Sequence, residues 1–476
     1  MANGWPASRA VGSTDVTAPA RDLLAVLREP ATIRARCAAI TAAVSDGRSG
    51  WFRVDRSRLD EAAARVEAVM RRRFPDLRIP LHSRWRHFEA GGVDRKAELD
   101  ARLAGRDALD VARARFDLTV VSVLLDAGAG PAWRYTEHTG PIATDALPAG
   151  RHSRDDLMAA LDRAAGHVAD AAMPAAATVP AADPAATTAY ARSEGLGVAS
   201  FRAFVGGAFS SHTGDPLRVD AAALRQIDVA ALRAIFQASP NNPLVGLEGR
   251  AGLLVRLGQA LKAEAERTGH EARPALVFDR LSADGTRSAV NASELLQELL
   301  RTMAPIWRSG TVVMGVPAGD VWPHRWAGAA TAAGDDPTTR GVVPFHKLTQ
   351  WLAYSLIEPL QGAGIEVTGL DALTGLPEYR NGGLLIDGGV IVPRNPRDLE
   401  RRFKPGDEFV VEWRALTVSL LDELAERVRQ RLGVSAEAMP LACILEGGTW
   451  AAGREIAGER RGGSPPVAID SDGTVF

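Results

Sequence analysis

The sequence contains little lysine and little cysteine, and both shortages restrict what the protein can be. Lysine occurs only at positions 96, 262, 347 and 404 of the 476 residues, so arginine supplies most of the positive charge. Because lysine is so rare, Lys347 is hard to explain as a casual surface cation. The two cysteines, Cys37 and Cys443, form neither a CxxC pair nor a disulfide framework, and we expect two small core residues in a reducing compartment.

Long apolar runs and an excess of one charge are missing as well. The N-terminus lacks the apolar segment of a signal peptide, and no uninterrupted apolar run approaches the length of a membrane span. The formal net charge of -2 gives no electrostatic reason to attract nucleic acid or an anionic membrane. We therefore expect a cytoplasmic protein that has neither nucleic acid nor a membrane as a partner.

Several familiar catalytic motifs do not occur in the sequence. It has no GxSxG elbow, HExxH pair, P-loop, kinase signature or Rossmann fingerprint. Asp320 and His324 are four residues apart with a proline between them, so they cannot form a regular helical ligand pair, and no second pair accompanies them. We expect neither a metal nor a cofactor, which leaves acid–base chemistry by a carboxylate.

Amphipathic helical patterns fill most of the chain, whereas strand-like segments are few and short. This balance predicts a mainly α fold without alternating βαβ units. We expect a disordered tail at residues 1–20, helical regions at 21–170 and 191–476, and an Ala/Pro linker or loop at 171–190. The two helical regions are either separate domains or one compact domain, and the main site belongs to the second.

Some local patterns depend on how the chain packs. The segment FDLTVVSVLLDAG is apolar nearly all round, so it should be a core helix in which Asp117, Ser122 and Asp126 need partners. Residues 272–281, ARPALVFDRL, predict a strand, and residues 408–432 change from strand-like alternation to a helix. The glycines of GGT and AGR near the C-terminus predict turns that close the fold.

Residues 344–387 concentrate polar groups in an otherwise apolar sequence. They begin with an amphipathic helix that Pro359 and the following glycines should end. A carboxylate, a phenol and a guanidinium then follow one another at Glu378, which predicts either a pocket wall or an ordinary helix end. The candidate binding residues of this stretch are His346, Lys347, Gln350, Tyr379, Arg380 and Asp387.

Two further segments are candidates for substrate binding. Trp85, His87 and Phe88 alternate with arginines, a pattern that suits either stacking on a flat base or sugar, or a buried aromatic patch. The loop that carries Asp320 and His324 is the other.

Glu378 is the leading catalytic candidate because cationic and phenolic side chains accompany it. A carboxylate that faces a bound sugar can stabilise an oxocarbenium ion or take a proton from the attacking water. Cations beside it, such as Lys347 and Arg380, would hold a 5'-phosphate or an acidic leaving group. The alternative is a purely structural carboxylate at a helix end.

Seven segments between about residue 31 and the last residue form a distinctive set: PATIRARCAAI, RWRHFEAGGVDR, FDLTVVSVLLDAGAG, GVPAGDVWPH, PFHKLTQWLAYSLIEPL, LTGLPEYRNGGLLID and SDGTVF. In these segments the chain resembles the uracil-catabolism protein family of fungi and bacteria, long described as a domain of unknown function. The resemblance implies a role in the pathway that degrades uracil through a ribosylated intermediate and releases urea.

The C-terminal half contains four further motifs: FHKLTQWLAYSL, LTGLPEYR, NPLVGLEGRAGLLVRLGQAL and VEWRALTVSLLDEL. In these motifs it is similar, more distantly, to the queuosine salvage proteins. Those proteins are N-ribosyl hydrolases whose mainly helical fold is similar to helix-hairpin-helix DNA glycosylases, so the resemblance implies that architecture with a few short strands. Glu378 occupies the position of their catalytic Asp and is one methylene longer.

Together these features lead to the hypothesis of an N-ribosyl hydrolase that cleaves a ribosyl-urea type intermediate in its 5'-phosphorylated form. Glu378 would act at the anomeric carbon, and Tyr379 with the aromatic cluster around His87 would line the pocket. The alternatives are an amide or ureide hydrolase of the same pathway and a non-catalytic binder of a nucleotide-derived intermediate. The expected partners are the small ribosylated substrate and other enzymes of uracil catabolism.

Overall fold

A computed structural model describes residues 18–126, 128–139, 186–307, 310–330 and 336–470 of the chain. Most of the predicted tail at residues 1–20 and most of the predicted linker at 171–190 lie outside the described residues. Within these ranges, no helix combines the length and the apolar character that crossing a lipid bilayer requires.

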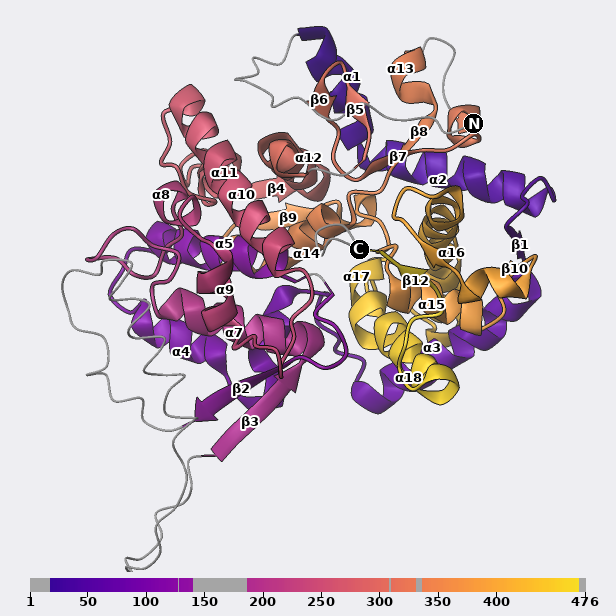
Figure 1. Cartoon of the computed structure of the whole chain (residues 1–476), viewed down its shortest axis with the longest axis horizontal. Helices are drawn as coiled ribbons and strands as arrows, with labels where there is room; N and C mark the ends of the chain where they lie inside the picture. The colour runs from indigo at the N-terminus through magenta and orange to yellow at the C-terminus, as the bar shows by residue number, and fades with distance from the viewer. Residues whose placement is uncertain (1–17, 127, 140–185, 308–309, 331–335, 471–476) are drawn as a thin grey trace, which may run out of the picture.

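Helices account for most of the described residues, so the predicted mainly α fold is confirmed (Figure 1). The glycosylase-like architecture remains an expectation from the resemblance. The α-helices are α1 (Ala18–Arg28), α2 (Pro30–Ser45), α3 (Leu59–Arg73), α4 (Arg95–Arg102), α5 (Ala108–Leu124), α7 (Arg192–Val205), α8 (Ala221–Leu224), α9 (Val229–Ile235), α10 (Leu247–Thr268), α11 (Leu276–Ser282), α12 (Ala292–Met303), α13 (Pro337–Arg340), α14 (Lys347–Gly362), α15 (Tyr379–Asp387), α16 (Glu408–Leu432), α17 (Leu441–Ile444) and α18 (Trp450–Arg461). Shorter turns include the 3-10 segment η2 (Arg84–Gly92) and the π-helical turn η8 (Leu445–Thr449).

The strands of the described chain pair only in twos, and most of these pairs join segments that are distant in sequence. The antiparallel pairs are β1 (Phe52–Val54) with β10 (Ile391–Pro393), β2 (Arg134–Thr139) with β3 (Ala186–Ala191), β5 (Val312–Val313) with β6 (Val316–Pro317), and β7 (Val321–Pro323) with β8 (Val342–Pro344). The parallel pairs are β4 (Ala289–Asn291) with β9 (Glu366–Thr368), and β11 (Arg402–Phe403) with β12 (Ala468–Ile469).

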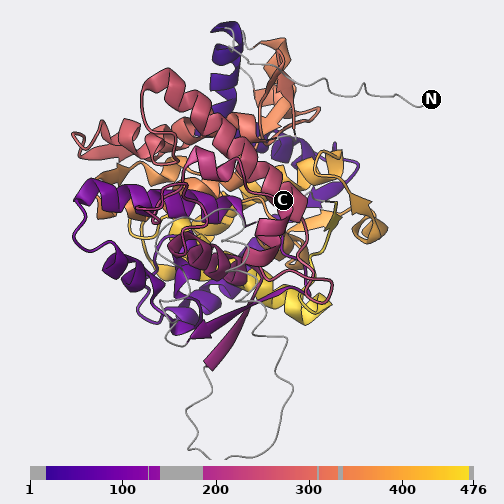
Figure 2. The ribbon, with the colours of Figure 1, turned by 60° about the vertical axis from the view of Figure 1, so that its left-hand side comes forward.

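Helix α14 lies at the centre of the arrangement. It packs against α5 and α12, while α16 packs against α2 and α3, and α15 against α16 and α18. In Figure 1, α14 lies between α5 with the magenta helices on one side and α15 to α18 on the other. The purple N-terminal segments contribute helices to both sides, as Figure 2 also shows. One apolar core extends from Val44 to Val467, so segments before and after residues 140–185 share it.

Helix α5 runs through this core as its apolar sequence predicts, and its polar residues have the partners that burial requires. Asp117 accepts hydrogen bonds from Arg273 at 2.7 Å and from two backbone N–H groups, each at 2.9 Å. Ser122 and Asp126 both accept from Arg84. The prediction that these three residues need partners is therefore confirmed, and Asp117 joins α5 to two distant loops.

Two predictions of local structure are wrong. The predicted strand at residues 272–281 contains helix α11, because periodicity alone cannot separate a short apolar strand from a buried helix. Residues 408–432 are helical throughout. Most of the first half of α16 is buried, so the alternation of apolar and polar residues there does not indicate a strand. Helix α14 continues through Pro359 and ends at Gly362, one of the glycines that were predicted to end it.

The predicted C-terminal turns are wrong as well, because their glycines lie in the helical segments η8 and α18 and pack closely on neighbouring residues. A Cβ atom on Gly447 would come within 2.7 Å of Ile79, and one on Gly448 within 2.5 Å of Val66. These glycines therefore allow close packing, and they do not form chain reversals.

Asp117→Ala should lower the free energy of unfolding by about 3–5 kcal/mol, because it leaves the buried guanidinium of Arg273 without its carboxylate. Asp110→Ala on the same helix is the control. The side chains of Asp110 and Arg113 are 46% and 23% exposed, so losing their ion pair should cost less than about 1 kcal/mol. Urea unfolding curves of the two variants and the wild type measure both effects. Equal losses of unfolding free energy in the two variants would contradict the role of Asp117 in joining α5 to the two loops.

Candidate functional site

A buried ion pair fixes the start of α14. Asp320 accepts hydrogen bonds from both Nη atoms of Arg414, each at 2.7 Å, and both side chains are more than nine-tenths buried. Burial alone would raise the pKa of Asp320, but the adjacent guanidinium holds it below its usual value. Asp320 also accepts the backbone N–H of Lys347 at 3.0 Å. This carboxylate therefore positions the first residue of α14, and the contacts favour a structural role for it.

His346, another predicted binding residue, forms the N-cap of α14 with the left-handed φ of 48°. Its Nε2 lies 3.0 Å from the carbonyl oxygen of Leu27 and therefore donates to it. Burial lowers the pKa of His346 to about 4, so the ring is neutral at pH 7. The ring anchors α14 to α1.

Glu378 is the N-cap of α15 and is only 7% exposed. Its carboxylate accepts the backbone N–H groups of Arg380 at 2.7 Å and Asn381 at 2.6 Å. The predicted alternative of a helix end thus describes its backbone contacts. Burial nevertheless raises the pKa of Glu378, and the attraction of Lys347 and the two N–H groups only partly offsets this effect.

Lys347 faces the same site from the opposite helix. Its ammonium makes no hydrogen bond or ion pair with any described residue, and burial lowers its pKa against the attraction of Glu378 and Asp126. A lysine at the first position of a helix also meets the positive end of the helix dipole, which further disfavours its charge. Lys347 and Glu378 therefore attract each other without forming a direct ion pair.

A second carboxylate approaches Lys347 from the end of α5. Asp126 accepts a hydrogen bond from the fully buried Arg84 at 3.0 Å. The guanidinium of Arg84 also lies 5.6 Å from the ring centre of Trp351, one turn after Lys347 on α14. The charge of Asp126 acts on Lys347 and on the phenol of Tyr379, so α5, η2, α14 and α15 all contribute to one site.

Several buried nitrogen atoms around this site have no hydrogen-bond partner among the described residues. Buried polar groups are nearly always bonded in folded proteins, so such a concentration is typical of a binding site. The ring of His87 lies 6.0 Å from that of Trp351, and burial lowers the pKa of His87 well below its usual value. The unpartnered atoms are Nη2 of Arg84, Nδ1 of His87, Nε2 of Gln350, Nε1 of Trp351 and Nε of Arg380.

The contacts of four other predicted binding residues involve groups outside this set. Trp85 and Phe88 pack edge to face at 5.3 Å in the core, which favours the buried aromatic patch for these two. His324 lies 3.7 Å from Glu412, and Asp387 accepts from Arg461 at 2.6 Å. Their assignment to substrate binding stays a prediction.

Three residues of the site were not among the predicted site residues. Asp126 carried one signal, since a carboxylate in an apolar helix needs a cation. Arg84 stood among the arginines of the aromatic segment, and Trp351 on the polar arc of α14. Their convergence with Glu378 depends on tertiary packing, which spacing along the chain does not reveal.

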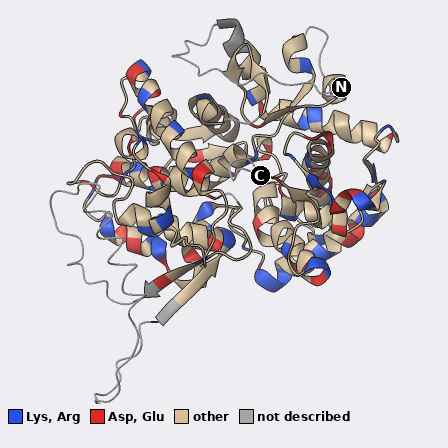
Figure 3. Cartoon of the chain, viewed as in Figure 1, with Lys and Arg blue, Asp and Glu red and all other residues tan. Residues whose placement is uncertain are grey.

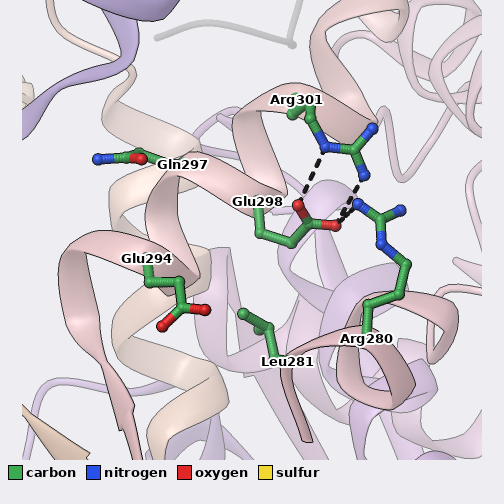
Figure 4. A pocket seen from close by; sticks show the side chains of 6 residues that line it. All are labelled: Arg280, Leu281, Glu294, Gln297, Glu298 and Arg301. Atoms are coloured by element: carbon green, nitrogen blue, oxygen red, sulfur yellow. Dashed lines mark hydrogen bonds and ion pairs between the residues drawn. The ribbon is translucent and has the colours of Figure 1, made fainter. Parts of the chain in front are cut away.

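An open pocket elsewhere on the surface has different chemistry (Figure 4). Arg301 binds Glu298 through Nε at 3.0 Å, and Arg280 pairs with the same carboxylate. Each charged residue of the pocket has an oppositely charged partner, so the network joins α11 to α12. The lining residues are Arg280, Leu281, Glu294, Gln297, Glu298 and Arg301.

Charges of both signs are distributed over the described helices (Figure 3). Figure 3 shows Lys and Arg interspersed with Asp and Glu along the described helices. In the described ranges, no group of three or more His, Cys, Asp or Glu side chains is arranged to hold a metal ion. The expectations about nucleic acid and other partners stay predictions.

The fold and site define a mainly helical protein with a buried pair of opposite charges, and sequence comparison places it in a family. The chain belongs to the family described as "Protein of unknown function (DUF1688)", whose model matches residues 26–147 and 173–476. The resemblance to the uracil-catabolism family is thereby confirmed, whereas the distant likeness to queuosine salvage proteins stays a prediction.

Two relatives match nearly the whole chain. Protein urg3 of Schizosaccharomyces pombe is 37% identical over 434 residues, which cover 89% of this chain and 92% of the relative. Uracil catabolism protein 4 of Lachancea kluyveri is 34% identical over 460 residues, which cover 91% of this chain and 93% of the relative.

Relative to Glu378→Gln, the wild type should lose stability as the pH rises from about 5 to 8. Burial raises the pKa of Glu378 in the folded state, so its protonated form stabilises the fold at low pH. This contribution disappears as the pH rises through the folded-state pKa, whereas the neutral amide does not titrate. Urea unfolding of both proteins across this range measures the difference in stability, and a difference that instead favours the wild type at high pH would contradict the assignment.

Proposed function

We propose that the protein is an N-ribosyl hydrolase of uracil catabolism, which cleaves the bond between ribose and a nitrogen of a ribosyl-urea type intermediate. The relative named uracil catabolism protein 4, with 34% identity over almost all of both chains, supports the pathway. The arrangement around Glu378 supports the reaction.

The observation that carries the proposal is the pair formed by the buried Glu378 and the partly buried Lys347, which attract each other without a direct ion pair. Ionised groups are rarely buried unless they are paired, because removing them from water costs several kcal/mol, about 3–5 when one partner is lost. A substrate between the two groups would meet a carboxylate on one side and an ammonium on the other. The pKa of Glu378 is raised and that of Lys347 is lowered, so each group is closer to neutrality than usual and better suited to transfer a proton.

The two groups can complete a balanced hydrolysis. The oxygen of a water molecule bonds to the anomeric carbon while the carbon–nitrogen bond breaks, and the carboxylate of Glu378 takes the proton of the water. Lys347 gives a proton to the departing nitrogen, so the products are free ribose and urea. A proton then passes from Glu378 to Lys347 and restores both groups. The carboxylate also stabilises the positive charge that develops on the sugar.

The unpartnered donors suit the leaving group. The carbonyl oxygen of urea accepts hydrogen bonds, and Nε1 of Trp351 and Nη2 of Arg84 are buried donors that lack an acceptor. Binding them to this oxygen would stabilise the negative charge that the departing nitrogen delocalises onto the carbonyl. The neutral ring of His87 beside Trp351 would form one wall of the pocket.

Purified protein incubated with synthetic ribosylurea, with and without a 5'-phosphate, should release urea and the free sugar. Glu378→Gln should lower kcat by about 100- to 10,000-fold with little change in KM, the range typical of a lost acid–base group. Glu378→Asp keeps the carboxylate, so its kcat should lie between the kcat values of the wild type and of Glu378→Gln. Glu366→Gln, an exposed change of the same kind on β9, is the control.

The product analysis also separates the alternatives. Ammonia or a sugar that still carries nitrogen would support an amide or ureide hydrolase, and tight binding without any product would support a binder. Near-full turnover by the folded Glu378→Gln protein would contradict the role of this carboxylate. Thermal unfolding of each variant shows whether the change in the N-cap has altered the fold.

A further inference from the structure

Two arginines from distant parts of the chain meet at Gly463. Arg380 donates from Nη1 to the carbonyl oxygen of Gly463 at 3.2 Å. A Cβ atom on Gly463 would lie 3.4 Å from Nη2 of Arg192, the first residue of α7. Both guanidinium groups therefore lie close to the same backbone segment, directly after α18.

Neither arginine has an acidic partner among the described residues. Arg192 makes no hydrogen bond or ion pair there, and Nε of the buried Arg380 is unpartnered. The pKa of Arg192 is lowered by burial and by the charge of Arg380, and Arg454 and Arg134 add to this repulsion. Most arginines of this protein are joined to carboxylates, so two adjacent cations without one are exceptional here.

Two residues of the backbone at this contact, Arg192 and Gly463, have positive φ angles. Arg192 has a φ of 54°, a left-handed value that is unfavourable for a residue with a side chain, and Gly463 has a φ of 89°. Left-handed residues other than glycine often lie at functional sites, where the surrounding structure compensates the cost of about 1–3 kcal/mol. Here the strain brings the side chain of Arg192 towards Gly463.

We propose that Arg192 and Arg380 form the subsite for a phosphate monoester, the 5'-phosphate of the ribosylated substrate. A phosphate dianion carries up to two negative charges and three acceptor oxygens, which match two guanidinium forks. Arg380 follows Glu378 by two residues and its guanidinium lies 5.0 Å from the ring centre of Tyr379, so the subsite adjoins the catalytic carboxylate. This assignment rests on the proposed function for the identity of the sugar, and it adds Arg192 from α7 to the site.

The test compares ribosylurea with its 5'-phosphate on the wild type and on Arg192→Gln. The wild type should prefer the phosphorylated substrate in kcat/KM, and Arg192→Gln should reduce this preference by about 10- to 100-fold, as expected for a lost hydrogen bond between charged groups. The kcat/KM for unphosphorylated ribosylurea should fall much less than the kcat/KM for the 5'-phosphate. Arg192→Lys keeps the charge but loses the fork and should recover part of the preference.

Arg460→Gln on the exposed face of α18 is the matched control, since it removes the same charge and should leave the preference intact. Equal turnover of both substrates by the wild type, with no effect of Arg192→Gln, would overturn the subsite while the hydrolase stands. If neither substrate is cleaved, calorimetric titration of the wild type and of Arg192→Gln with ribose 5-phosphate tests the phosphate subsite by itself. Binding that Arg192→Gln weakens would support the subsite without the hydrolase, and equal or absent binding would overturn it.

Discussion

The attraction between Glu378 and Lys347 across a site without direct contact is the constraint on which the rest of the arrangement depends. Each group stands at the N-terminal end of a helix, where the dipole favours the carboxylate and opposes the ammonium. The carboxylate is additionally held by two backbone N–H groups, so its position is rigid. Lys347 has no such support except through its backbone, which Asp320 anchors.

The polar groups of the interior fall into two kinds. Asp117 and Asp320 are buried and fully bonded, each to an arginine and to backbone N–H groups, and they join distant segments. Around Trp351 the opposite holds, since several buried nitrogen atoms have no acceptor within the described structure. Since buried polar groups are usually bonded, a cluster of unpartnered donors around one pair of charged residues is consistent with a ligand that supplies the acceptors.

The sequence indicates several residues of the site, but it does not indicate how they are arranged in space. The rarity of lysine and the triplet beginning at Glu378 were visible in the chain, and the structure brings Lys347 and that triplet together. The need of Asp126 for a cation was also visible, because a carboxylate in an apolar helix has few alternatives. Arg192 gave no signal, since it is one arginine among many and meets Arg380 only through the packing of α7 near α18.

The errors in the fold have the same origin. A short apolar run such as α11 is buried on all sides, so its periodicity carries no information about helix or strand. The glycines of η8 predicted turns, but in the structure they allow η8 to pack closely against α3. The overall helix content follows from local sequence patterns. The structure of α11 and of η8 depends instead on which elements of the fold pack against them.

The most direct test of the central claim is a crystal structure of the Glu378→Gln protein soaked with ribosylurea 5'-phosphate. The account predicts that the anomeric carbon lies between position 378 and the ammonium of Lys347, with the urea group towards Trp351. A ligand bound elsewhere, with Lys347 and position 378 both facing away from the sugar, would contradict it.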